Sequence, residues 1–265
     1  MLEITSRTNE KIKYAVHLGE SASFRREQNE FFLEGARLCR DAAESGIPVR
    51  QAFFTRAALN HYAPYTDVIC RKAGECYLIS DDIAGKLAAT EGAQGVFCVC
   101  QGLKAPGSAE QLNPQGRYLA LENVQDPSNL GAVCRTAEAL GITGLIISGG
   151  CDVYNPKALR AAMGSSLRME LLLVSDLPGL LTEANAKGML TLASTPREKA
   201  ENICRIPLPQ GVICAVGNEG SGITDATFAA CQKAVTIPMA GRAESLNASA
   251  AAAILIWELS GKGQS

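Results

Sequence analysis

Short apolar runs separated by amphipathic stretches dominate the chain from residue 117 onward. Six of these runs are continuous and brief, which is typical of strands buried on both faces of a parallel sheet. They cover residues 118–121, 144–148, 171–174, 189–193, 211–216 and 234–237. Helical patterns fall between or after them, at residues 130–140, 156–163, 180–187, 225–231 and 247–260. This alternation predicts an α/β domain with a parallel sheet and helices on both faces.

The first hundred residues have a mixed pattern. Helices are predicted at 9–18 and 34–44, the second ending at the stop signals Ser45-Gly46 and Pro48. Strands are predicted at 51–55, 75–79 and 95–100. Turn-forming residues then cluster between 103 and 116. We therefore predict a small α/β domain at 1–102, a linker at 103–116 and a larger domain at 117–265.

Composition narrows the class of protein. The chain has 265 residues, 47% of them hydrophobic, and a formal net charge of −2, which fits two folded domains rather than a disordered chain. The longest apolar stretch, Ala248–Trp257, is too short to span a bilayer. The N-terminus turns polar at its third residue, so no signal peptide is predicted. We expect a cytoplasmic protein.

Ten cysteines and two histidines give no metal-binding pattern. No cysteine pair has the two-residue spacing of a zinc or redox motif, and most cysteines lie inside apolar segments. We expect reduced core cysteines and no metal site.

Three polar segments follow predicted strands, where ligands bind in parallel sheets. In the first, Leu121 to Ala137, a polar turn leads through Ser128 and Asn129, read as helix-capping residues, into a helix on which Gly131 and Arg135 share one face. Bare backbone beside a guanidinium offers room for an anionic ligand. The alternative is a surface arginine paired with Glu138.

The second segment, Ala215 to Thr224, contains three glycines and one carboxylate, Glu219. Glycines allow the backbone to approach a ligand closely, although the spacing matches neither the Walker nor the dinucleotide pattern. A helix-capping role for Glu219 is the alternative. In the third segment, Ile237 to Ala250, Ser245 and Asn247 stand at the head of an alanine-rich helix and could hold an anionic group.

The pI near 5.8 does not by itself indicate nucleic-acid binding. Any RNA surface must be a local patch. The candidates are Arg7, Lys11, Arg25, Arg26 and Arg37, with Arg160 in the second domain. An ordinary solvated surface is the alternative interpretation.

Together the three segments resemble the SpoU (TrmH) family of knotted RNA methyltransferases. The resemblance rests on Asn129-Leu-Gly-Ala-Val-Cys-Arg-Thr-Ala137, Val216-Gly-Asn-Glu-Gly-Ser-Gly222 and Ile237-Pro-Met followed by Ser245-Leu-Asn247. Residues 4–55 resemble the family's N-terminal substrate-binding domain, through Ser6-x-x-Asn9, Arg25 and Phe32-Leu-Glu-Gly35.

The resemblance implies a C-terminal trefoil knot, a homodimer through the C-terminal domain, and methyl transfer from S-adenosylmethionine to a ribose 2′-hydroxyl of RNA. Ribosomal RNA is the preferred substrate and transfer RNA the second. The implied cofactor-binding residues are Gly217, Ile237, Met239, Leu246 and Asn247. The implied catalytic residues are Arg135, Asn129, Glu219, Ser245 and Asn247. A guanidinium is a reluctant base, so we expect Arg135 to stabilise charge.

Two alternatives remain open. A catalytically silent RNA-binding protein of the same fold would bind without transferring a methyl group. A nicotinamide- or nucleotide-dependent enzyme on a doubly wound fold is disfavoured by the missing glycine fingerprint after the first strand.

Overall fold

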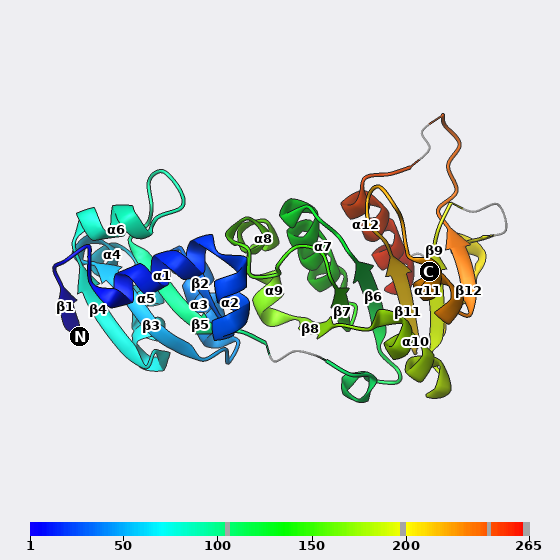
Figure 1. The fold of residues 1–265 in the computed structure, drawn as a ribbon, viewed down its shortest axis with the longest axis horizontal. Helices are drawn as coiled ribbons and strands as arrows, with labels where there is room; N and C mark the ends of the chain where they lie inside the picture. Colours follow the sequence, from blue (N-terminus) through cyan, green and yellow to red (C-terminus); the bar gives the residue numbers. More distant parts are fainter. Residues whose placement is uncertain (104–106, 197–199, 243–244, 262–265) are drawn as a thin grey trace. The chain divides into compact units, whose positions relative to one another are not determined.

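The structure is a computed structural model that describes residues 1–103, 107–196, 200–242 and 245–261. The chain divides into two compact units (Figure 1). Unit 1 comprises Met1–Leu103 and Tyr154–Arg168, and unit 2 comprises Lys104–Val153 and Met169–Ser265. The segment 154–168 therefore packs with unit 1, although both its neighbours in the sequence belong to unit 2.

Unit 1 contains a five-stranded mixed sheet with strand order β1-β4-β3-β5-β2. The strands are β1 (Leu2–Ile4), β2 (Glu30–Glu34), β3 (Val49–Thr55), β4 (Glu75–Ile79) and β5 (Val96–Gln101). The helices are α1 (Glu10–Glu20), α2 (Ala22–Gln28), α3 (Ala36–Glu44), α4 (Arg56–His61), α5 (Ala63–Lys72), α6 (Asp81–Leu87), α8 (Pro156–Ala162) and α9 (Ser165–Arg168).

Side chains alternate along the strands of unit 1 and build a core on each face of the sheet. Phe31 and Phe54 pack on one face, where Leu159 of α8 is also buried. Phe32 and Phe53 pack on the opposite face with residues of α1 and α6. Both faces are therefore covered, which explains why strands of this unit read as largely apolar.

Unit 2 contains a seven-stranded sheet in the order β10-β12-β9-β11-β6-β7-β8, in which all paired neighbours are parallel. The strands are β6 (Arg117–Glu122), β7 (Gly144–Ser148), β8 (Glu170–Val174), β9 (Leu190–Ser194), β10 (Glu201–Asn202), β11 (Val212–Val216) and β12 (Lys233–Thr236). The helices are α7 (Pro127–Leu140), α10 (Leu177–Ala186), α11 (Asp225–Ala230) and α12 (Ala248–Leu259), with single 3₁₀ turns η1 (Ala109–Gln111) and η2 (Ile203–Arg205).

The predicted α/β class and parallel sheet are confirmed. All six strands and five helices predicted after residue 117 are present, with ends that differ by three residues or fewer. The predicted linker, 103–116, lies partly outside the described residues, at 104–106. Beyond that gap it is ordered, because Ala109 and Leu112 are buried in the core of unit 2.

Three predicted helix starts were wrong by two or three residues, among them that of α10, which begins at Leu177 instead of residue 180. The helix predicted from Glu34 begins at Ala36, because Glu34 belongs to β2 and Gly35 has a φ of 108°. The helix α7 begins at Pro127 with Asp126 as its N-cap, earlier than the predicted residue 130. Ser128 and Asn129 are consequently not capping residues but lie inside the first turn.

The cysteine prediction holds for half of the ten residues. Cys39, Cys98, Cys100, Cys134 and Cys214 are buried, whereas Cys204 is exposed and is no core residue. Within the described residues, no group of three or more His, Cys, Asp and Glu side chains is placed to hold a metal ion. None of the described helices has both the length and the apolar character needed to cross a membrane.

Candidate active site

The pairing of β6 with β11 brings two of the predicted segments together. Leu121 pairs with Val216 in the parallel register, so both strands end at the same edge of the sheet. The loop after β6 and the glycine-rich loop after β11 therefore lie side by side. The two loops are about ninety residues apart in the sequence, and the pairing of β6 with β11 brings them together.

The glycine-rich loop is a tight turn organised by Asn218. The backbones of Asn218 and Gly222 exchange two hydrogen bonds of 3.0 and 2.9 Å. The Asn218 side-chain oxygen accepts hydrogen bonds from Gly220 and Ser221, and its Nδ2 donates to the carbonyl oxygen of Asn123. These bonds fix the loop internally and tie it to the loop after β6.

Gly217 is the position in this loop where only glycine fits. A Cβ atom there would lie 2.0 Å from the backbone carbon of Gly222 and 2.1 Å from the backbone nitrogen of Ile223. Both obstacles are backbone atoms and cannot rotate away. Glycine is therefore required at this position for steric reasons. The backbone of Gly217 approaches the backbone of Gly222 and Ile223 closely, so the crowding arises within the chain itself.

Three predicted catalytic residues form one hydrogen-bonded group. The Nδ2 of Asn129 donates to Glu219 Oε1 at 2.9 Å, and the Nδ2 of Asn247 donates to Asn129 Oδ1 at 3.2 Å. The residues come from α7, the glycine-rich loop and the N-cap of α12. The Asn247 Oδ1 also accepts from the backbone of Ser249 and Ala250, which caps α12.

Glu219 is held as a carboxylate. Burial raises its pKa, but hydrogen bonds from the Asn129 side chain and from the backbone N–H groups of Glu219, Gln125 and Asp126 outweigh burial and lower the pKa below its usual value. The group therefore accepts hydrogen bonds at neutral pH. In this geometry it orients Asn129 and is not the helix cap considered as the alternative, since Thr224 caps α11.

Glu122 is a site residue that the sequence analysis missed. Its buried carboxylate, at the end of β6, accepts hydrogen bonds from the backbone N–H and hydroxyl of Thr224 and from the hydroxyl of Thr227. It thereby anchors the far end of the glycine-rich loop and the start of α11. The available signal was a carboxylate ending an apolar strand, a costly position unless the group is paired.

A cleft of about 530 Å³ lies beside the glycine-rich loop. Of the predicted cofactor-binding residues, Gly217, Ile237, Met239 and Leu246 line it, and so do the predicted catalytic residues Glu219 and Ser245. Asn247 does not line the cleft but contacts Asn129. The end of β9 and the two residues that follow it, 194–196, contribute a wall that the sequence did not predict. The volume lies in the usual range for small-molecule sites.

The family comparison fits this geometry. Residues 116–257 match the model of the SpoU rRNA Methylase family, and residues 9–98 match the MRM3-like substrate binding domain. The chain belongs to the SpoU rRNA methylase family. The membership of the SpoU family that the three segments indicated is therefore confirmed. So are the predicted enzyme class, an RNA 2′-O-ribose methyltransferase, and its cofactor, S-adenosylmethionine.

Similar proteins cover nearly the whole of this SpoU-family chain. It is 30% identical to the 23S rRNA (guanosine(2553)-2'-O)-methyltransferase RlmP of Bacillus subtilis, over 98% of this chain and 100% of that protein. It is 28% identical to the 23S rRNA (uridine(2479)-2'-O)-methyltransferase of Streptomyces viridochromogenes, over 96% and 90% of the two chains.

A solved structure shares the fold over the same extent. The AdoMet-bound rRNA methyltransferase of Sinorhizobium meliloti superposes with a TM-score of 0.86 at 25% identity, covering 98% of this chain and 97% of that chain.

Arg135 stands apart from the hydrogen-bonded group. It lies on α7, exposed to solvent, and its guanidinium makes no hydrogen bond or ion pair within the part of the SpoU-family chain that the structure describes. The alternative interpretation, a surface arginine tied to Glu138, has no support in this geometry. An exposed cation without a partner is available to a ligand.

The predicted RNA contact at Arg25 requires correction. Arg25 is only 4% exposed, and its Nη1 donates to the carbonyl oxygens of Leu18 and Gly19 at 2.6 and 3.1 Å. Its guanidinium thus satisfies the C-terminal end of α1 and is not presented at the surface. The sequence pattern could not separate it from its neighbour Arg26, which is exposed.

The other predicted RNA-binding residues of the SpoU-family chain are accessible. Arg7 forms an exposed ion pair with Asp82, and Lys11 forms one with Glu75. Exposed pairs of this kind stabilise a protein little and can be exchanged for phosphate. Arg26, Arg37 and Arg160 are exposed, and Arg160 also lines a pocket of unit 1.

Proposed function

We propose that this protein transfers a methyl group from S-adenosylmethionine to a ribose 2′-hydroxyl of ribosomal RNA. The observation that carries the proposal is the bonded group Asn129–Glu219–Asn247 beside the cleft at Gly217. The named relatives that act on 23S rRNA support ribosomal RNA over transfer RNA. We also propose that the protein works in the cytoplasm, where bacterial ribosomal RNA is modified.

The cleft residues suit S-adenosylmethionine. Ile237, Met239 and Leu246 offer apolar contacts, while the loop around Gly217 brings polar backbone close to the cleft. When bound, the cofactor supplies an activated methyl group on a sulfonium. The chain's own task is to hold that ligand and the ribose in one orientation.

We assign charge stabilisation to Arg135. A hydroxyl becomes a nucleophile only as its proton leaves, so negative charge develops on the 2′-oxygen. A guanidinium stays protonated at physiological pH and can bind that oxygen and the adjacent phosphate. Asn129, held on both sides by Glu219 and Asn247, and Ser245 in the cleft then orient the ribose and cofactor.

A homodimer and a C-terminal trefoil knot are part of the proposal. Ile254 and Trp257 expose apolar surface on α12 at 37% and 45%, and α12 packs against α7, which carries Arg135. A partner subunit covering this face would bury both side chains. We further propose that residues 1–102, together with the segment 154–168 that packs with unit 1, bind the RNA, and that the rest of 117–265 carries the knotted methyltransferase domain. Arg7, Lys11, Arg26, Arg37 and Arg160 would contact phosphates.

The test is methyl transfer from labelled S-adenosylmethionine to unmodified ribosomal RNA, with the label mapped to ribose or base. Arg135→Ala should lower kcat by about 100- to 1000-fold, the loss typical of a removed oxyanion donor. Arg205→Ala is the matched control, because Arg205 is an exposed arginine of unit 2 that does not line the cleft.

Label on a base would contradict the reaction class. An inactive wild type that still binds S-adenosylmethionine and RNA would favour the silent RNA-binding alternative. Full activity in Arg135→Ala would remove Arg135 from the mechanism while leaving the reaction in place.

A further inference from the structure

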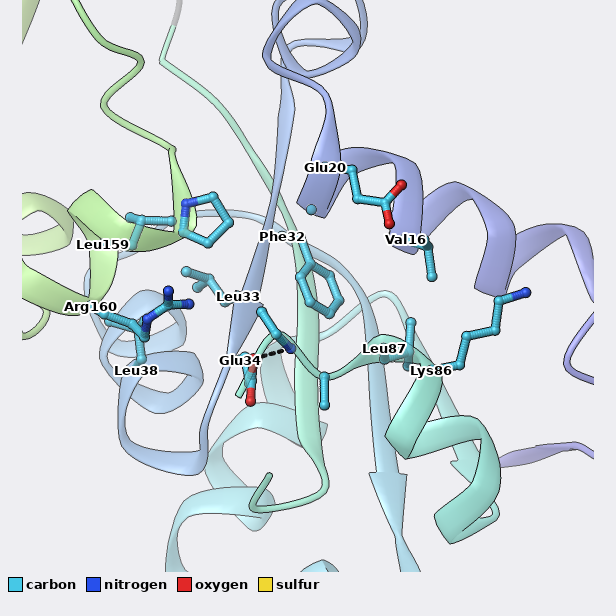
Figure 2. A pocket seen from close by; sticks show the side chains of 14 residues that line it. Val16, Glu20, Phe32, Leu33, Glu34, Leu38, Lys86, Leu87, Leu159 and Arg160 are labelled. Atoms are coloured by element: carbon cyan, nitrogen blue, oxygen red, sulfur yellow. Dashed lines mark hydrogen bonds between the residues drawn. The ribbon is translucent and has the colours of Figure 1, made fainter. Parts of the chain in front are cut away.

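Unit 1 contains a pocket that the methyl-transfer site does not use. It has a volume of about 140 Å³ and lies between α1, β2, the segment after α6, and α8. Figure 2 shows the Phe32 ring at its centre, with Val16 and Leu87 on one side and Leu159 and Arg160 on the other. Apolar surface predominates in its lining.

The α8 wall of this pocket is firmly attached to unit 1. Leu159 is buried in the unit 1 core, and the ring of Tyr154, just before α8, stacks on Phe31 with centroids 4.1 Å apart. Beyond α8, Arg168 forms an ion pair of 2.7 Å with the buried Asp41. The pocket therefore has a preformed shape, as ligand sites usually do.

The size of the pocket limits what it can hold. A cavity of about 150 Å³ with apolar walls accepts one benzene ring. The pocket beside Phe32 thus has room for one six-membered ring and its substituents, whereas a bicyclic purine is larger. We propose that it accepts a single unstacked pyrimidine base of the RNA substrate, an inference that rests on the proposed function.

The polar groups at the pocket fit a nucleotide. Arg160 is exposed, and its guanidinium makes no hydrogen bond or ion pair among the described residues, so this group is free to bind a phosphate. Glu34 accepts hydrogen bonds from the backbone N–H of Ala89 and the hydroxyl of Thr90. Its oxygens retain lone pairs for the N–H groups of a base. The ring of Phe32, which is 4% exposed, forms part of the apolar wall that the base would contact.

The direct test is nuclear magnetic resonance of the full chain with labelled Leu and Val methyl groups, titrated with uridine 5′-monophosphate. We expect saturable shifts at Val16, Leu87 and Leu159 with uridine 5′-monophosphate, weaker ones with adenosine 5′-monophosphate and none with ribose 5-phosphate. Absent shifts, equal shifts with ribose 5-phosphate, or tighter binding of the purine nucleotide would each overturn the proposal.

Gly19 supplies a matched pair of variants. It lines the pocket from within α1, and an added Cβ would contact Phe32 at an ordinary 3.6 Å. Gly19→Leu should fill the pocket, while Gly19→Ala should leave it open, and both favour the helix. Filling should weaken uridine 5′-monophosphate binding at least about fivefold, the smallest loss expected for one stacked base.

The same pair separates this inference from the proposed function. In methyl transfer to ribosomal RNA, Gly19→Leu should raise KM for the RNA by a similar factor, with kcat and S-adenosylmethionine affinity unchanged. Wild-type kinetics in both variants would overturn the pocket's role while methyl transfer stands. If the wild type transfers no methyl group, the proposed function falls, and the nucleotide titration still decides what the pocket binds.

Discussion

The candidate active site of unit 2 is assembled from polar side chains that bind one another, whereas the pocket of unit 1 is walled by side chains that pack. In unit 2, Asn129 lies between Glu219 and Asn247 at hydrogen-bonding distance on both sides. In unit 1, Phe32 and Leu159 belong to the apolar cores of the sheet. The two sites therefore depend on different forces.

This difference matches two different tasks. Methyl transfer needs reacting atoms held within a narrow geometry, and directional hydrogen bonds between side chains provide it. Selecting a base by size needs only a rigid apolar wall and a nearby cation. The catalytic activity of unit 2 should consequently be sensitive to the change of a single polar atom or the addition of one side-chain methyl group. Base binding by unit 1 should be sensitive to changes in side-chain packing.

Within the glycine-rich loop of unit 2, the largest effect should come from Gly217→Ala. A Cβ at 2.0 Å from the backbone of Gly222 forces the loop to move by an ångström or more, and a displacement of that size costs about 100-fold in kcat/KM. Gly220→Ala is the control in the same loop, because its nearest contact would be 3.4 Å. The measurement is kcat/KM together with S-adenosylmethionine affinity. Equal activity of both variants would show that the loop does not shape the cleft.

Unit 1 also contains a buried polar group that its packing encloses, and the loss of this group should destabilise the unit. Arg25→Ala removes the donor for the carbonyls of Leu18 and Gly19 and should cost about 2–3 kcal/mol in unfolding free energy. Arg26→Ala, one residue further and exposed, should change it by less than about 0.5 kcal/mol.

The single tryptophan, Trp257, gives a way to assign that loss to one unit. Its fluorescence reports unit 2, while circular dichroism reports both units. In denaturant unfolding, Arg25→Ala should shift the dichroism transition to a lower denaturant concentration and leave the fluorescence transition unchanged. An equal shift of both would mean that the two units unfold together and that the contrast between them is not thermodynamic.

The sequence predicted unit 2 far better than unit 1. Strands such as Val212–Val216 are buried on both faces and read as continuous apolar runs bounded by turns. In unit 1, β1 and β2 were missed. The first has only three residues, and Glu30–Glu34 begins and ends with a charged residue. Short elements carry too little periodicity to be recognised.

The site was predicted in its parts but not in its connections. Motif resemblance selected Asn129, Glu219 and Asn247, yet nothing in the local pattern says that Asn129 bonds to both of the others. That contact depends on the β6–β11 register and on α12 packing against α7. Likewise, only the folded chain shows that Glu122 anchors Thr224 and that Arg25 is buried.

The smallest predicted effect tests the hydrogen-bonded group by charge. Asn129→Asp places a second carboxylate against Glu219, which should lower kcat about tenfold at neutral pH through repulsion and lost donation. In the wild type, the hydrogen bond from Asn129 helps to lower the pKa of Glu219. The contribution of the Glu219 carboxylate to stability is therefore fully present above the usual pKa of a glutamate, and it is lost as the pH falls through the lowered pKa of Glu219. The variant should behave in the opposite sense, because two adjacent carboxylates titrate together with one raised pKa, and a shared proton restores the hydrogen bond. Its kcat should therefore rise relative to wild type as the pH is lowered from neutral, a change that a pH profile of both proteins measures.

Asn129→Ala serves as the control, since it removes the same donor without adding a carboxylate and should give a parallel, lower profile. If the pH profile of Asn129→Asp also runs parallel to that of the wild type, the charge of Glu219 does not contribute to positioning residue 129. The contrast between a hydrogen-bonded site in unit 2 and a packed pocket in unit 1 would then weaken.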